Sequence, residues 1–268
     1  MALVSLAALQ DKADYKAALD KLLRPYEEMF FPAPTTLFIY LGSLYPAAPK
    51  LGVNPHPVLV AALIEWAYKA WTAKICLAAR AAPGFEFAKT WQLSGYKALN
   101  SYGAKTLDLG QATYVSRSSS LALFCSEYLL PQQLLSADCL INMGKFRAGQ
   151  GRLFGSAFNN LAALTDLPYT IEAFPRALVD LYSIVNPDLH IIDALRGLSG
   201  WQPQPQDALL AATDAAALDM TLATLASLPG ERVEEIALAA QYGLGAAAAA
   251  EIILVGDAPA VWGLEDRG

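Results

Sequence analysis

The chain has 268 residues, of which 55% are hydrophobic and 16% are charged, and its formal net charge is −6. This length suffices for one large α/β domain or for two closely packed lobes. The negative charge argues against nucleic-acid binding, which requires a basic face. The chain contains no run of about 18 apolar residues, so we expect no transmembrane segment.

The first 30 residues predict an N-terminal helical extension. Their apolar side chains fall roughly on one helical stripe: Leu3, Leu6, Leu9, Tyr15, Leu19 and Leu22. The stretch lacks a cationic leader, and Asp11 and Lys12 come too early for a secretory signal. We therefore expect a helical extension over residues 1–30, a single α/β domain over residues 31–268 and, by default, a cytoplasmic location.

Beyond residue 30 the chain alternates between apolar runs of strand length and stretches with helical spacing. Strands are expected at residues 36–41, 73–79, 105–109, 138–146, 188–195, 207–213 and 251–257. Helices are expected at residues 56–71, 91–103, 156–164, 171–186, 214–227 and 233–243. The segments TYVSR and LALFCSEYLL could add antiparallel strands. This alternation predicts an α/β fold, in which a mainly parallel sheet is flanked by helices in Rossmann-like layers.

The cysteines and histidines do not form a metal-binding pattern. Cys76, Cys125 and Cys139 are widely spaced in apolar surroundings, without a C-x-x-C motif. We expect buried, reduced thiols, and neither a metal site nor a bound cofactor. His190 lies in an apolar strand and reads as a core residue, whereas His56 stands at a helix start and could be a cap or a site residue.

The segment GKFRAGQGRLFG, residues 144–155, is the strongest candidate for a binding site. It follows a strand, precedes a helix, and places Lys145, Arg147 and Arg152 among four glycines. Ligands of α/β proteins bind at such strand ends, and helix-start N–H groups with cations can hold a phosphate or a carboxylate. The segment matches neither a Walker loop nor a dinucleotide fingerprint. It is therefore a mobile turn, an anion site or a protein-docking surface.

Three aspartates could complete such a site. Asp193 ends the strand 188–195, a position from which carboxylates reach a ligand. Asp214 is suited to cap the following helix. Asp219 lies on a partly buried face, where it needs a partner, and a cation of the segment 144–155 is one candidate.

Several segments together resemble a family described as a domain of unknown function, DUF362. They are VNPHPVLVAAL, SGYKALNSYGAKTLDL, SADCLINMGKF and FNNLAAL, followed by FPRALVDLYSIVNPDLHIIDALRGLSG, ATDAAALDM and AAQYGLG with IILVGD. The resemblance spans residues 36–257 and is most specific in residues 174–219. Members of the family often stand beside ferredoxin-type 4Fe–4S cassettes, so the resemblance implies a redox setting. The present chain carries no such cassette.

The resemblance also implies that some site residues are replaced. The family's Lys-Pro-Asn signature reads Phe38, Ile39 and Tyr40 here, and its Pro-Lys-Leu-Lys-Thr-His stretch reads Gly144 to Gly149. A Lys-Asn pair reads Asn159–Asn160. The aspartates that match the family are Asp193, Asp214 and Asp219. This pattern indicates a divergent member that keeps the fold and loses much of an anion-binding pocket.

Two functional hypotheses follow. The first is a non-catalytic, degenerate member that serves as a structural or accessory subunit of a larger assembly. Its partners would be proteins, such as an iron–sulfur or other redox complex, and peripheral association with a membrane complex is allowed. The alternative is an enzyme or binding protein for a small anionic ligand. Its candidate ligand-binding residues are Lys145, Arg147, Arg152, Asn160, Asp193, Asp214 and Asp219.

Overall fold

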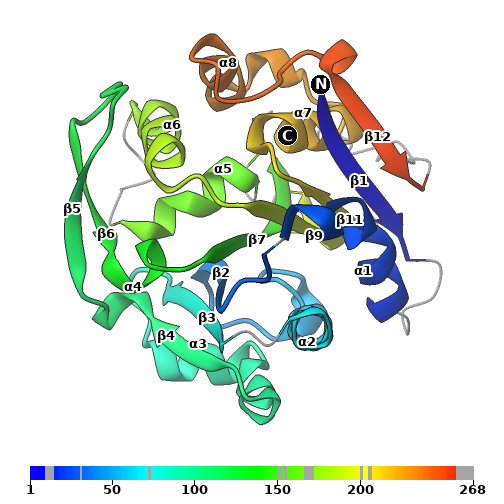
Figure 1. Ribbon diagram of the computed structural model, residues 1–268, viewed down its shortest axis with the longest axis vertical. Coiled ribbons are helices and arrows are strands. Elements are labelled where there is room, and N and C mark those ends of the chain that lie inside the picture. Colours follow the sequence, from blue (N-terminus) through cyan, green and yellow to red (C-terminus); the bar gives the residue numbers. More distant parts are fainter. Residues whose placement is uncertain are drawn as a thin grey trace.

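The computed structural model of the chain describes residues 1–9, 15–30, 32–71, 74–149, 152–153, 156–165, 172–199, 202–204 and 207–257. A ten-stranded sheet crosses the molecule (Figure 1). Eight of its strands lie side by side, in the order β12 (Ile252–Gly256), β1 (Ala2–Ala8), β11 (Ala208–Ala212), β9 (Leu189–Ser199), β7 (Cys139–Gly149), β2 (Thr36–Leu44), β3 (Lys74–Ala81) and β4 (Lys105–Asp108). The fold is the predicted mainly parallel α/β class.

Within this row, β11 alone runs against the others. It pairs antiparallel with both β9 and β1, whereas the remaining neighbours pair in parallel. Two short strands, β8 (Arg152–Leu153) and β10 (Gln202–Gln204), pair antiparallel with β7 and β9. A separate antiparallel pair consists of β5 (Tyr114–Ser118) and β6 (Glu127–Pro131), which confirms the two additional strands expected there.

Helices cover both faces of the sheet (Figure 1). One face packs against α1 (Tyr15–Leu23), α2 (Pro57–Ala70) and α3 (Phe87–Leu93). The other packs against α4 (Gln132–Leu135), α5 (Ala157–Asn160), α6 (Phe174–Val185), α7 (Ala215–Leu225) and α8 (Glu234–Gln241). Short 3-10 helices span Arg24–Phe30, Pro49–Leu51, Tyr96–Tyr102, Leu109–Gln111, Leu161–Leu164, Gly230–Arg232 and Ala249–Glu251. We call the two sides the α2 face and the α7 face.

The beginning of the chain is a strand, so the prediction of a helix there was wrong. Ala2–Ala8 form β1, which lies between β11 and β12 in the main sheet. Val4 and Leu6 pack on the α7 face, and Ala7 packs on the α2 face. A strand covered on both faces is apolar at nearly every position, so its periodicity does not distinguish it from a helix. Helix α1 begins only at Tyr15.

The helix expected at residues 91–103 is interrupted. Helix α3 ends at Leu93, and a 3-10 helix follows from Tyr96. Between them, Gly95 adopts φ +81°, a conformation that ends the first helix. A Cβ atom at this position would lie 3.0 Å from Cγ of Pro49, so the close approach of the two turns also requires glycine.

The sheet has a topological switch point between β2 and β7. The chain passes from β2 to β3 on one side, whereas it passes from β7 to β9 on the other. The connections that leave the carboxyl ends of β2 and β7 therefore run in opposite directions along the sheet, and α/β proteins usually bind ligands at this edge.

Candidate functional site

The sheet divides the predicted site residues between its two faces. Successive side chains of a strand point to opposite faces. In β7, Ile141 and Met143 belong to the core of the α2 face, and Lys145 continues this alternation. In β9, the same alternation places Asp193 on the α2 face and His190 on the α7 face. The predicted residues consequently do not converge on one site.

Lys145 and Asp193 form a buried ion pair on the α2 face. They are register partners in β7 and β9, and Nζ of Lys145 lies 2.8 Å from Oδ1 of Asp193. The side chains are 2% and 0% exposed. Burial lowers the pKa of Lys145, and the adjacent Asp193 carboxylate opposes this shift. The charge that was expected to attract an anion is therefore matched internally.

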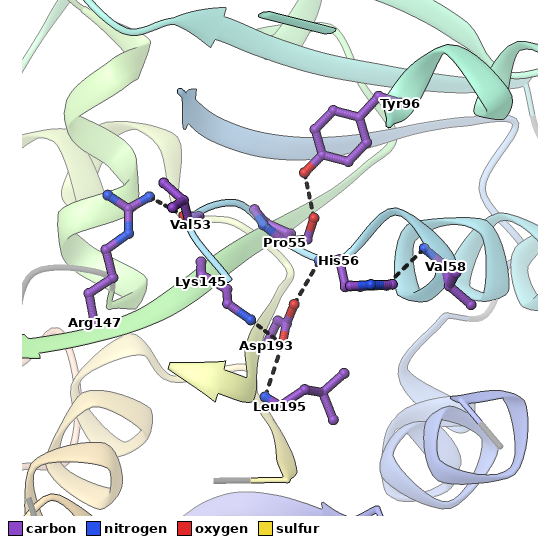
Figure 2. A network of polar contacts seen from close by, with 9 residues as sticks. All are labelled: Val53, Pro55, His56, Val58, Tyr96, Lys145, Arg147, Asp193 and Leu195. Atoms are coloured by element: carbon purple, nitrogen blue, oxygen red, sulfur yellow. Dashed lines mark hydrogen bonds and ion pairs between the residues drawn. The ribbon is translucent and has the colours of Figure 1, made fainter. Parts of the chain in front are cut away.

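Asp193 also fixes the start of α2 (Figure 2). Its Oδ2 accepts a hydrogen bond from the backbone N–H of His56 at 2.7 Å, and its Oδ1 accepts one from Leu195 N–H at 3.0 Å. His56 is the N-cap residue of α2, because its Nδ1 accepts from the N–H of Val58. The capping interpretation of His56 is thus confirmed. A single carboxylate joins β7, β9 and α2.

Residues 45–56, here called the covering segment, cross the carboxyl ends of β7 and β9. Arg147 donates to the carbonyl of Val53 at 2.7 Å, and Tyr96 donates to the carbonyl of Pro55 at 2.6 Å (Figure 2). Arg196 Nη1 donates to the carbonyl of Lys50 at 2.8 Å. Together with the bond from His56 to Asp193, these contacts fasten the segment along its length. The cation Arg147 binds a carbonyl of the protein itself.

The strand expected at residues 138–146 is longer than predicted, so the first half of the segment 144–155 is strand and not loop. Strand β7 continues to Gly149 and turns back into β8, where Arg152 pairs with Gly149. The strand persists because Lys145 and Phe146 are both buried, one on each face of the sheet. Residues 150, 151, 154 and 155 lie outside the described residues, and for Arg152 the structure places only the backbone.

Asn160 lies on the α7 face, at the switch point. Its Nδ2 donates to Oδ1 of Asn142 at 2.7 Å, and Nδ2 of Asn142 contacts Nδ1 of His190 at 2.9 Å. Gly42, at φ +72°, lies directly against it, because a Cβ atom there would be 1.9 Å from Oδ1 of Asn160. The side chain of Asn160 therefore fills the space beside the end of β2.

Among the side chains that the structure describes, Asp219 pairs with no cation of residues 144–155, which corrects that expectation. Its carboxylate accepts hydrogen bonds from the N–H groups of Ala157 at 2.8 Å and Phe158 at 3.1 Å. Burial raises the pKa of Asp219 to about 7, although these hydrogen bonds oppose the shift. The carboxyl group thus holds the start of α5 in place.

Asp214 is a helix cap, as predicted. Its Oδ1 accepts from the N–H of Ala217 at 3.0 Å, and its Oδ2 accepts from the N–H of Ala246 at 2.8 Å. It therefore joins the start of α7 to the segment after α8.

His190 is fully buried, which confirms its assignment to the core, and burial lowers its pKa to about 3.

The sequence reasoning missed three polar residues that organise this region: Asn142, Tyr96 and Asp180. Asn142 carried a usable signal, because it is an amide within an apolar strand. Asp180, in α6, accepts hydrogen bonds from the N–H groups of Leu123 and Phe124, both at 2.9 Å. Burial favours a higher pKa for Asp180, but these bonds and others prevail and lower it.

The thiols differ from expectation at one position. Cys139 is buried and Cys76 is half-buried, and burial raises their pKa values to about 12 and about 11. Cys125 is exposed, because it lies in the loop that Asp180 organises. Within the described residues, no group of three His, Cys, Asp or Glu side chains could hold a metal ion.

The mainly parallel sheet and the helices on both of its faces define an α/β protein with Rossmann-like layers. The model of the family described as "Domain of unknown function (DUF362)" matches residues 43–224, and the chain belongs to this family. The matched region contains the covering segment and all seven predicted site residues. A comparison with curated proteins found no match. Among the described helices, none is long and apolar enough to cross a membrane.

Proposed function

We propose that this protein is a non-catalytic, accessory subunit of a larger protein assembly. The observation that carries the proposal is the closed pair of Lys145 and Asp193 beneath the covering segment. A site that held an anion would need its cation to face the ligand. Here the cation faces a buried carboxylate, and the strand ends bind the protein's own backbone.

The energetics favour this closed state. An anion that approached Lys145 would meet the negative charge of Asp193 and would have to displace the covering segment. That displacement breaks the hydrogen bonds made by Arg147, Tyr96 and Arg196, each worth about 1 kcal/mol. It would also break the hydrogen bond from the His56 N–H to the Asp193 carboxylate, and a hydrogen bond to a charged group is worth about 1.5–3 kcal/mol. We therefore infer that the ion pair of Lys145 and Asp193 and the covering segment stabilise the fold and do not bind a ligand.

Strand β12 supports docking to a protein partner. It forms the end of the sheet, and its sequence IILVG contains neither a charge nor a proline. Ile253 and Leu254 are 41% and 47% exposed, although neighbouring residues of a strand point to opposite faces. Edge strands usually carry charges, prolines or bulges that prevent pairing. This one is suited to accept a further strand.

The occupant that we propose is an extended, apolar strand of a different protein. Antiparallel pairing of two copies about Leu254 would place Glu251 of each copy opposite Asp257 of the other. Directly opposed like charges destabilise a strand pair. A partner strand with a basic residue opposite Glu251 avoids this repulsion and complements the net charge of −6.

The family resemblance favours an iron–sulfur or other redox complex as the assembly. Its members often stand beside ferredoxin-type 4Fe–4S cassettes, and such a setting suits a role in which a partner protein carries the cofactor. We place this assembly in the cytoplasm, where it could also attach peripherally to a membrane complex.

Gentle purification from the native source, with mass measurement of the eluted species, tests this proposal. We expect the wild-type chain to elute with a stoichiometric protein partner. Leu254→Lys should release that partner while the fold is retained. Leu93→Lys is the matched control, because Leu93 is also 47% exposed but lies on α3. A monomeric wild-type chain, or equal retention by both variants, would refute the proposal.

The alternative function, binding of a small anionic ligand, has one observation in its favour. The Lys145 ammonium carries three N–H donors, and among the described residues Asp193 is its single hydrogen-bond acceptor. Thermal shift measurements with inorganic phosphate, nucleotides and small carboxylates distinguish the two functions. Stabilisation that is present in the wild type and absent in Lys145→Met would favour the alternative.

A further inference from the structure

A cavity of about 540 Å³ lies at the carboxyl ends of β3 and β4. Its wall consists of the turn after β3, the start of α3 and the 3-10 helix that follows β4. Small-molecule sites have volumes of about 300–1,000 Å³ and occupy this edge of α/β sheets. The location and the size of the cavity are therefore those of a ligand site.

The wall of the cavity is fixed before any ligand arrives. The N–H of Ala82 donates to the carbonyl of Leu44 at 2.8 Å, and the N–H of Phe85 donates to the carbonyl of Ala82 at 3.1 Å. Gly84 adopts φ +83°, and a Cβ atom there would meet nothing within 4 Å. Two backbone hydrogen bonds thus hold this turn, and the space beside Gly84 is open.

Arg80 belongs to the supporting structure of this wall. Its Nε donates to the carbonyl of Ala163 at 3.1 Å, and its guanidinium group also donates to the hydroxyl of Tyr114. The same guanidinium carbon lies 5.7 Å from the centre of the Tyr114 ring. These contacts direct the cation of Arg80 toward the protein.

The remaining lining groups combine aromatic rings with carboxylates. Phe85 is 50% exposed, and the half-buried Phe87 follows it at the start of α3. Asp108 accepts the N–H of Gly110 through Oδ1 at 2.8 Å, and within the described residues its Oδ2 has no hydrogen-bond donor. Glu86 adds an exposed carboxylate. Against Arg80, these two acids leave one negative charge in excess.

We propose that this cavity binds a small organic cation, namely a primary amine on an apolar or aromatic body. The ammonium group would donate to Asp108 Oδ2 and approach Glu86, while the body packs on Phe85 and Phe87. An aromatic face adds a favourable interaction with a nearby cation. This inference is independent of the proposed accessory role, because neither the covering segment nor β12 lines the cavity.

Titration with 2-phenylethylamine tests the inference, with 2-phenylethanol and 3-phenylpropionate as neutral and anionic probes of matched shape. Calorimetry should show binding of the amine at least about tenfold tighter than that of the alcohol, as a charge-assisted hydrogen bond implies. Amide NMR shifts should be confined to residues 80–88 and 108–111. Equal affinity for the three probes, or no binding at millimolar amine, would overturn the inference.

Variants locate the binding to the cavity. Asp108→Asn and Glu86→Gln should each weaken amine binding, the first by about tenfold. Ala88→Trp should abolish it by filling the cavity, since Ala88 is exposed and lines the wall. Glu28→Gln, an exposed acid outside the cavity, is the control and should change nothing. Glu86 is exposed, so its variant keeps the test valid even if Asp108→Asn is unstable. Unchanged binding in both Ala88→Trp and Glu86→Gln would contradict the proposal.

Discussion

Lys145 and Asp193 face each other across two parallel strands, with 2.8 Å between Nζ and Oδ1, and neither is accessible to solvent beyond a few per cent. Asp193 simultaneously accepts the N–H groups of His56 and Leu195. Through these contacts Asp193 connects β7, β9 and the start of α2 at the place where a ligand site was expected. Stability measurements on this pair are therefore the first test of the account.

Asp193→Ala should lower the free energy of unfolding by about 3–5 kcal/mol, because it leaves the Lys145 ammonium buried without a counter-ion. The double variant Lys145→Met/Asp193→Ala should lose less than the sum of the losses in Lys145→Met and Asp193→Ala, because it removes both charges. Urea unfolding of the four proteins measures the coupling. Additive losses would show that the two side chains do not interact.

Gly42→Ala should destabilise the protein well beyond the cost of its positive φ. The added Cβ atom would lie 1.9 Å from Oδ1 of Asn160, so the Asn160 side chain must move. Gly84→Ala is the matched control, with φ +83° and open space, and should cost only about 1–2 kcal/mol. In an Asn160→Ala background the cost of Gly42→Ala should fall toward that of the control. An unchanged cost would argue against the contact.

Asp219→Asn should change how stability depends on pH. Burial raises the pKa of Asp219 from its ordinary value of 3.8, which applies to the unfolded chain, to about 7 in the folded protein. Between these values the folded state binds the additional proton, so the contribution of Asp219 decreases by about 1.4 kcal/mol for each unit of rising pH. The variant should therefore gain stability relative to the wild type as pH rises from 4.5 to 6.5. A difference that is constant over this range would contradict the buried, protonated state.

His190→Gln should produce the opposite change. The folded-state pKa of His190 is lowered to about 3 from an ordinary value of 6.5. The unfolded state binds the additional proton between these values, so the contribution of His190 is complete above pH 6.5 and is lost as the pH falls toward 3. Relative to the wild type, the variant should become more stable with acidification. Thermal unfolding at several pH values measures both effects, which nearly cancel in the wild type.

Most of the sheet could be predicted from the sequence, because apolar runs of strand length that alternate with helical stretches indicate buried strands of a parallel sheet. The expected strand at residues 36–41 lies within β2, and the one at residues 188–195 lies within β9 except for its first residue. Residues 2–8 were misassigned because the partner that makes them a strand, β11, lies about 200 residues later in the chain. Local periodicity contains no information about that pairing.

The site was predicted less well, for two separate reasons. The strand was expected to end at residue 146, among glycines, and only the pairing of Arg147 and Ala148 with Leu198 and Ser199 of β9 explains why it continues to Gly149. The division of the site between two faces was partly foreseeable. His190 and Asp193 are separated by an odd number of positions in one strand, so they must point to opposite faces. The hydrogen bonds by which Asp219 holds the start of α5 depend on the packing of α7 against α5, which no local pattern reveals.

NMR of the backbone amides of His56 and Leu195 tests most directly whether the covering segment stays in place over Lys145 and Asp193, because both amides donate to Asp193. Inorganic phosphate is titrated into the wild-type protein while the shifts and the hydrogen exchange of these amides are recorded. The account predicts slow exchange and no shift at millimolar phosphate. Saturable shifts of both amides, together with faster exchange, would show that an anion opens the covering segment and would contradict the account.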